Sequence, residues 1–212
     1  MLQTAKKSDF SGKFFWHLFY FRIRFLRLFN RTIYLYCQIR GIKLGQDIKF
    51  TGFPRIRRHP YSEIYIGNKC TLNSYKHSDF FGLQKPCTLV TLNKDAEIKI
   101  GNNAGLTGTI MVCASRISIG NNVMMGEHTL IFDTDFHNPD PSVRLYNDNR
   151  PSRPVTIEDN VFIGYNCLIL KGVTIGKNSV IGANSVVIGN VPENSIAIGN
   201  PCKVIMRKNW NE

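Results

Sequence analysis

The residues best suited to chemistry are a histidine and two aspartates in the polar stretch Asp133-Thr-Asp135-Phe-His137. In an extended segment, alternate side chains share a side, so Asp133, Asp135 and His137 would project together. A carboxylate bound to one ring nitrogen fixes the imidazole tautomer and raises the basicity of the other nitrogen. Such a histidine can deprotonate a hydroxyl group. We therefore predict His137 as a general base, with Asp135 as the first and Asp133 as the second candidate to orient it.

A six-residue repeat follows this stretch and organises the chain. The period fits neither the 3.6 residues of a helical turn nor the alternation of one strand, but it is typical of a parallel β-solenoid. Each hexapeptide then supplies one short strand and one turn, where Gly or Asn adopts backbone angles that branched residues resist. We predict an all-β solenoid whose inward side chains are the residues that recur every six positions, Ile157, Ile163, Ile169, Ile175, Ile181 and Val187.

The aspartates and the histidine lie where this repeat is interrupted. The period is clear from Ile98 to Ile131, is lost over the polar segment 132–154, and returns up to Val187. Loops inserted into a regular scaffold often carry function. This position favours a catalytic role for His137 over the alternative, which is a solvated polar loop without chemistry.

Charge and aromatic content set the N-terminal segment apart. Residues 1–60 hold 13 Lys/Arg and 2 Asp/Glu, a net charge of +11, whereas residues 61–212 hold 14 and 13, a net charge of +1. The stretch 14–37 lacks Gly and Pro and is rich in aromatic residues, so we predict one or two helices. A transmembrane span is not expected because four arginines lie in the middle of the stretch, at Arg22, Arg24, Arg27 and Arg31.

Two compatible roles stay open for this segment. It would pack against the solenoid or a neighbouring subunit, or it would contact an anionic membrane surface. Nucleic-acid binding is disfavoured because no binding module accompanies the charge. The predicted divisions of the chain are therefore a basic aromatic helical segment (1–40), irregular early coils and loops (41–97), the repeat with its inserted loop 132–154 (98–205), and a C-terminal tail (206–212).

Cysteine usage and the N-terminus indicate the compartment. No basic-apolar-small sequence with a cleavage site begins the chain, so no signal peptide is expected. We predict a cytoplasmic protein, peripheral on the inner face of the membrane if the N-terminal segment binds lipid. The cysteines lack metal-ligand spacing and are predicted to be reduced and mostly buried, at Cys37, Cys70, Cys87, Cys113, Cys167 and Cys202.

The repeat, its interruption and the ending Gly199-Asn-Pro201-Cys-Lys203-Val-Ile205 resemble the hexapeptide-repeat acyltransferases. The similarity covers roughly residues 98–208 and is strongest to the branch of galactoside, maltose and polysaccharide O-acetyltransferases. It implies a left-handed parallel β-helix, acetyl-CoA as co-substrate and His137 as the catalytic histidine. The implied reaction is direct: the deprotonated acceptor hydroxyl attacks the thioester carbonyl, and a backbone N–H of the coil stabilises the oxyanion.

The resemblance also implies where the donor binds. The CoA arm would run along the outside of the coil between subunits, past Gly164 and Tyr165 at the pantetheine, then Ala183, to Lys203 at the nucleotide phosphates. Coil geometry alone would also explain Gly164 and Ala183. A homotrimer is implied, because a closed three-fold ring supplies the between-subunit site three times.

The acceptor is less defined. Where the galactoside enzymes have an Asn and an Asp for the sugar, this chain has Thr107–Gly108 and Cys113–Ala114, so a galactoside bound in the same way is not expected. We predict an O-acetyltransferase for a saccharide of surface polysaccharide biosynthesis, with a lipid-linked acceptor favoured by the basic aromatic N-terminus. The alternatives are N-acetylation of an amino sugar and a catalytically silent scaffold.

A zinc site is a further alternative for the histidines of this chain. A related solenoid family, the γ-class carbonic anhydrases, binds zinc through three histidines shared between subunits. His128 and His137 would supply two ligands, with His77 or His59 as the third. Neither residue has good spacing for that role, so no metal is expected.

Overall fold

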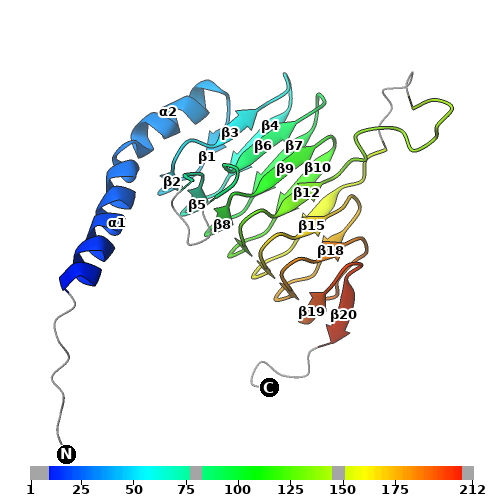
Figure 1. The fold of residues 1–212 in the computed structure, drawn as a ribbon. Helices are drawn as coiled ribbons and strands as arrows, with labels where there is room; N and C mark the ends of the chain where they lie inside the picture. The colour runs from blue at the N-terminus through cyan, green and yellow to red at the C-terminus, as the bar shows by residue number, and fades with distance from the viewer. Residues whose placement is uncertain (1–9, 77–82, 145–150, 207–212) are drawn as a thin grey trace, which may run out of the picture.

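Two helices precede a coil of short strands in the computed structural model, which describes residues 10–76, 83–144 and 151–206 (Figure 1). Helix α1 spans Phe10–Leu28 and helix α2 spans Asn30–Ile39. The predicted helical segment is thus present as two helices, with a break at Phe29. The predicted C-terminal tail 206–212, apart from the backbone of Met206, and His77 lie outside the described residues.

The chain then visits three sheets in turn, so each sheet gains one strand per coil. Sheet A consists of β1 (Lys43–Leu44), β4 (Glu63–Ile66), β7 (Glu97–Ile100), β10 (Arg116–Ile119), β13 (Val155–Ile157) and β16 (Thr174–Ile175). Sheet B consists of β2 (Lys49–Thr51), β5 (Thr71–Asn73), β8 (Gly105–Thr107), β11 (Met124–Met125), β14 (Phe162–Ile163), β17 (Val180–Ile181), β19 (Ser195–Ile198) and β20 (Lys203–Met206). Sheet C consists of β3 (Arg55–Arg57), β6 (Thr88–Thr91), β9 (Ile110–Cys113), β12 (Leu130–Phe132), β15 (Leu168–Ile169) and β18 (Val186–Val187).

The register shows how the hexapeptide period becomes a core. Ile157 pairs with Ile175 in sheet A, and Ile163 pairs with Ile181 in sheet B. All of the predicted inward residues are buried, and full burial of one such side chain stabilises the fold by about 1.5–3 kcal/mol. Strands pair in parallel throughout, except β19 with β20, which closes the last coil. This confirms the predicted left-handed parallel β-helix with an N-terminal helical segment.

Each coil turns three corners, which we name A–B, B–C and C–A after the sheets they join. At the A–B corner, asparagines with positive φ stack in successive coils and link their side-chain amides by hydrogen bonds of 2.9–3.1 Å. Asn tolerates this left-handed conformation, and the ladder satisfies its amide groups. The members of the ladder are Asn103, Asn122, Asn160, Asn178 and Asn194.

The parallel pairing of strands begins earlier in the chain than the regular six-residue repeat. Strands β1, β4 and β7 already pair in register, so the segment 41–97 belongs to the same coil. Its main irregularity is the loop between β5 and β6, of which residues 77–82 lie outside the described part of the chain.

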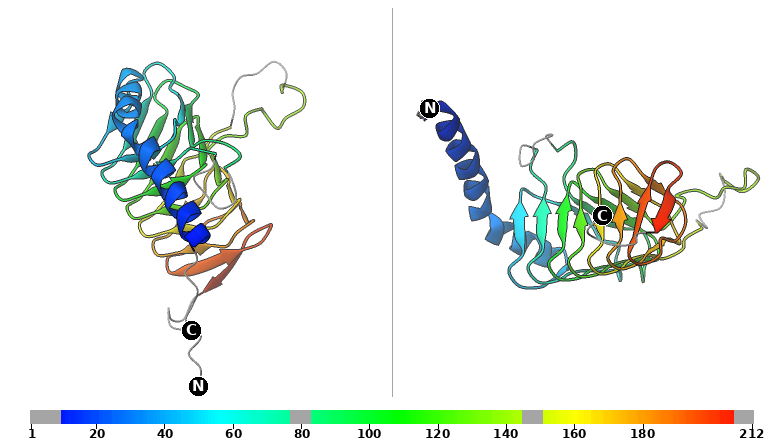
Figure 2. Two further views of the ribbon diagram at one scale, coloured as in Figure 1. Left: turned by 60° about the vertical axis from the view of Figure 1, so that its left-hand side comes forward. Right: turned by 90° about the horizontal axis from the view of Figure 1, so that it is seen from below.

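Helix α2 covers the open end of the first coil. Ile33 and Cys37 are fully buried. The Asn30 side chain donates to Ile48 O at 2.9 Å and accepts from Phe50 N at 2.7 Å, which ties the helix to β2. Helix α1, in contrast, extends away from the coil (Figures 1 and 2).

The cysteines are placed as predicted. All are free thiols; all but the half-buried Cys202 are buried. Burial raises the pKa of Cys37 to about 12, so this thiol stays protonated at neutral pH.

Candidate active site

The predicted catalytic segment forms a loop at the C–A corner, between β12 and β13. Its two ends are held together near the coil. Thr134 bridges to Ser152 in antiparallel fashion, Asp135 N donates to Pro151 O at 3.2 Å, and Arg153 N donates to Asp133 O at 2.9 Å. The base of the loop is therefore a short two-stranded stem fixed to the coil, and residues 145–150 lie outside the described chain.

Asp133 does not orient His137 in this structure, so the prediction of that role is wrong. Its carboxylate is fully buried and accepts hydrogen bonds from Ala114 N at 2.6 Å and Ser115 N at 2.7 Å. It thus holds the C–A corner of the preceding coil. Burial, and then this carboxylate, raise the pKa of the Cys113 thiol above its usual value.

The expected alternation of the three side chains fails for a local reason. Phe136 has φ of +65°, so the segment turns instead of continuing as a strand. The Phe136 ring packs edge-on against Phe132, with ring centroids 5.1 Å apart. Asp133 is buried, as is Ile131 two residues before it, while Asp135 and His137 are exposed.

Asp135 has a partner that the sequence analysis did not identify. Its carboxylate forms an ion pair with Lys171 Nζ, from the C–A corner of the next coil. The His137 imidazole makes no hydrogen bond to any residue that the structure describes. A base candidate with an exposed imidazole therefore lies two residues from an anchored carboxylate.

The residues implied for the donor lie along a different edge, the B–C corner. A Cβ on Gly164 would lie 2.7 Å from Ala183 N, so coil stacking alone requires glycine there. Tyr165 and Ala183 are exposed, and Asn184 N donates to Tyr165 O at 2.8 Å. Lys203 follows the hairpin turn whose Cys202 N donates to Val186 O at 2.9 Å. The four residues thus follow one edge towards the C-terminal end of the coil.

The two sets of residues do not meet within one chain. Sheet C separates them, because the donor corner leads into β15 and the loop with His137 leaves β12 on its other side. Within one chain, the residues implied for the donor and His137 therefore lie at opposite edges of sheet C.

The histidines of the metal alternative are also apart. His128 lies at the B–C corner and His137 beyond the C–A corner, while His59 Nδ1 contacts Pro60 O at 2.7 Å. Within the described ranges, no three His, Cys, Asp or Glu side chains are placed to share a metal ion.

Glu127 is a second residue that the sequence analysis missed. It is 5% exposed at the B–C corner, one coil before Tyr165. Its Oε1 accepts from Gln84 N at 3.3 Å, whereas Oε2 is buried without a hydrogen-bond partner among the described residues. A signal was present, because an acid stands where the next two coils have Tyr165 and Ala183.

The chain is similar in sequence to known acyltransferases. Residues 154–189 match the family model described as the hexapeptide repeat of succinyl-transferase. The chain is 43% identical over 139 residues to a galactoside O-acetyltransferase of Lactococcus lactis, covering 66% of this chain and 60% of that protein. The chain thus spans less than two thirds of the length of this curated relative.

Two solved structures are similar over most of both chains. A hexapeptide-repeat acetyltransferase from Vibrio cholerae is 26% identical with a TM-score of 0.52, covering 86% of this chain and 90% of that one. An N-acyltransferase from Bacillus cereus, in complex with dTDP and coenzyme A, has a TM-score of 0.61 and is covered over 88% of its length by 82% of this chain. Because the two are only 18% identical, this similarity shows the fold alone. Together with the sequence matches, these findings confirm the predicted resemblance.

Proposed function

We propose that this chain, a hexapeptide-repeat acyltransferase, is an acetyl-CoA-dependent O-acetyltransferase that acts on a saccharide hydroxyl. The observation that carries the proposal is His137, exposed and open to a ligand at the one interruption of the regular repeat between Ile98 and Val187. We place its role in surface polysaccharide biosynthesis and its location in the cytoplasm.

His137 acts as the general base in this proposal. Its free ring nitrogen accepts the proton of the acceptor hydroxyl as the oxygen attacks the thioester carbonyl, and the proton then leaves with the CoA thiolate. The bond that forms is the ester C–O bond and the bond that breaks is C–S. Acetyl-CoA supplies the activated acyl group. Asp135, anchored by Lys171, is the remaining candidate to orient His137.

We propose that the donor binds along the B–C corner. The features that fit it are the exposed Ala183 and Tyr165, which leave the edge accessible to a linear arm, and the exposed Lys203, which offers a cation for phosphates. Since these residues and His137 lie at opposite edges of sheet C, we propose that each site combines two copies in a homotrimer.

The test is turnover with the purified chain. Acetyl-CoA is offered with simple sugars, nucleotide sugars and oligosaccharides, while thiol release and product mass are followed. We expect an acetylated saccharide whose acetyl group is removed by mild alkali, as an ester is. An alkali-stable product would indicate N-acetylation of an amino sugar. Absence of both turnover and acyl-CoA binding would favour the silent scaffold.

A further inference from the structure

We infer that α1 is a docking helix for the surface of an anionic membrane. The helix contacts the rest of the chain at β2 and α2. From there it extends away from the coil instead of covering it (Figure 2). Its position therefore leaves most of its surface without a partner in its own chain.

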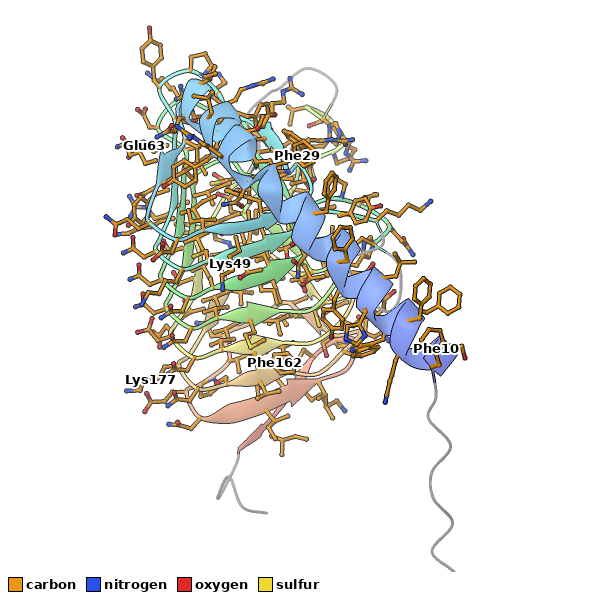
Figure 3. All side chains as sticks on the ribbon, turned by 90° about the vertical axis from the view of Figure 1, so that its left-hand side faces the viewer. Phe10, Phe29, Lys49, Glu63, Phe162 and Lys177 are labelled. Carbon is orange, nitrogen blue, oxygen red and sulfur yellow. The ribbon has the colours of Figure 1, made fainter. Side chains whose placement is uncertain are left out.

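Among the side chains of α1 that the structure describes, most of the exposed ones are large and apolar. Phe10, Phe15 and Phe21 are 77%, 67% and 66% exposed. In Figure 3, α1 lies between the labelled Phe10, at its start, and Phe29, just after its end, and its side chains project around it. Contiguous exposed apolar surface of this kind marks an interaction site. The other members are Phe14, Trp16, Leu18, Tyr20 and Phe25.

The charge of the segment favours lipid over a second copy of the chain. Residues 10–46 contain seven Lys/Arg and no Asp/Glu. The solenoid of another copy offers no net complementary charge, since residues 61–212 carry a net charge of +1. Anionic lipid headgroups supply that complement, and aromatic rings are favoured at the boundary between headgroups and acyl chains.

The helix fits a position on the membrane rather than across it. Among the described residues, no helix is long and apolar enough to cross a membrane. Helix α1 contains Lys13, Arg22, Arg24 and Arg27 within its length. A basic aromatic helix that lies in the interface keeps its charges at the headgroups while its rings enter the acyl boundary.

If the proposed function holds, docking places the solenoid beside lipid-linked acceptors. Membrane binding by α1 does not depend on the proposed function, because it is measured without donor or acceptor.

The experiment is flotation of the full-length chain with vesicles of phosphatidylcholine alone or mixed with phosphatidylglycerol. We expect binding only to the mixed vesicles, and weaker binding as salt rises, because charges are screened within about 10 Å at 0.1 M salt. The variant F15A/W16A/F21A should bind about 100-fold or more weakly, since three large side chains no longer leave water. The matched control, I198A/V204A/I205A, removes exposed apolar side chains at the other end of the coil and should bind like the parent.

A charge variant separates electrostatics from apolar insertion. K13E/R31E should bind the mixed vesicles about tenfold or more weakly, whereas K99E, which changes an exposed lysine of sheet A, should not. The inference is overturned if the parent ignores anionic vesicles, or if F15A/W16A/F21A binds them like the parent. It is also overturned if that variant changes the oligomeric state by light scattering and leaves vesicle binding intact, because α1 would then be a subunit contact. Turnover on a soluble acceptor, measured on the same samples, reports separately on the proposed function.

Discussion

The outer faces of sheets A and C come from the same repeat and carry opposite kinds of side chain. Along sheet A the outward row is polar, and the ion pairs Lys43–Glu63 and Arg116–Glu97 lie beside it. Its members are Lys43, Tyr65, Lys99, Ser118, Thr156 and Thr174. Along sheet C the row changes from Arg55 and Thr88 to Ile110, Leu130, Leu168 and Val186.

The repeat therefore determines its inward and its outward residues independently. The inward residues are alike in all three sheets, so they define the coil and nothing about its surroundings. The outward residues differ in kind: those of sheet A are polar and suit contact with water, whereas the apolar row of sheet C suits contact with another apolar surface. Sheet C is also the sheet flanked by His137 on one side and by Tyr165 and Ala183 on the other. A second copy packed near sheet C would therefore complete the proposed site.

The largest expected effect comes from the edge of sheet C. His137→Ala should lower turnover by roughly 10²–10⁴, the usual contribution of a general base. Trimer formation and CoA affinity should be unchanged, because the loop lies outside the coil. His59→Ala, which removes a histidine three coils earlier along the same edge, should retain parental turnover. Parental turnover in His137→Ala would refute the mechanism, and loss of CoA binding would instead assign His137 to the donor site.

Mixing two inactive variants tests whether the two edges of sheet C, from different copies, form one site. Ala183→Trp should block the donor corner, so this variant and His137→Ala should each be inactive alone. Denatured and refolded together, they should regain measurable turnover, because some interfaces then pair an intact loop with an intact donor corner. Failure to regain activity in mixed trimers, verified by native mass spectrometry, would contradict a site shared between copies.

A charge introduced on the outer face of sheet C should have a larger effect on association than one on sheet A. Leu168→Arg places an unpaired charge within the apolar row of sheet C and should weaken association on the order of 100-fold or more. Thr156→Arg makes a matched change in the polar row of sheet A and should leave the oligomer intact. Sedimentation over a dilution series distinguishes the two. Equal association of both variants would remove the functional difference between the faces.

The sequence was sufficient for the coil because its information is local. The period from Ile157 to Val187 repeats every six residues, and each member is buried as expected. The inserted loop could be predicted for the same reason, since an interruption is visible against a regular pattern.

Contacts between coils were not predictable in the same way. The carboxylate of Asp133 is bound by Ala114 and Ser115 of the preceding coil, and Asp135 is bound by Lys171 of the next. Both contacts depend on how the loop re-enters the coil, and the alternation rule failed at the positive φ of Phe136. Sequence spacing therefore predicted the position of the loop but not the hydrogen-bond and ion-pair partners of its two aspartates.

A smaller effect on turnover is expected from Asp135. Asp135→Asn should reduce turnover less than His137→Ala does, because the base remains and only its orientation suffers. Lys171→Met removes the partner of the same ion pair and should have an effect of similar size. Steady-state kinetics should show a lower kcat with little change in KM for the acceptor. A change in KM alone would assign the pair to acceptor binding.

Stability separates the two aspartates. Asp133→Ala should lower the free energy of unfolding by about 3 kcal/mol, because two buried N–H groups lose charged acceptors. Asp135→Ala removes an ion pair at the surface and should cost about 1 kcal/mol or less. Denaturant midpoints at constant slope measure both. Equal losses would contradict the assignment of Asp133 to the coil and Asp135 to the loop surface.

The smallest effect is expected on the outer face of sheet A. Lys43 Nζ lies 2.7 Å from Glu63 Oε1, but both side chains are more than half exposed. Water and salt screen such a pair, and ordering two long side chains opposes it, so its coupling energy should be about 0–1 kcal/mol. A double-mutant cycle with Lys43→Ala and Glu63→Ala isolates that energy. The same cycle at high salt should give a value closer to zero, since screening acts on exposed charges. A coupling energy well above about 1 kcal/mol would show that this face is shielded from water, and the contrast between sheets A and C would then no longer hold.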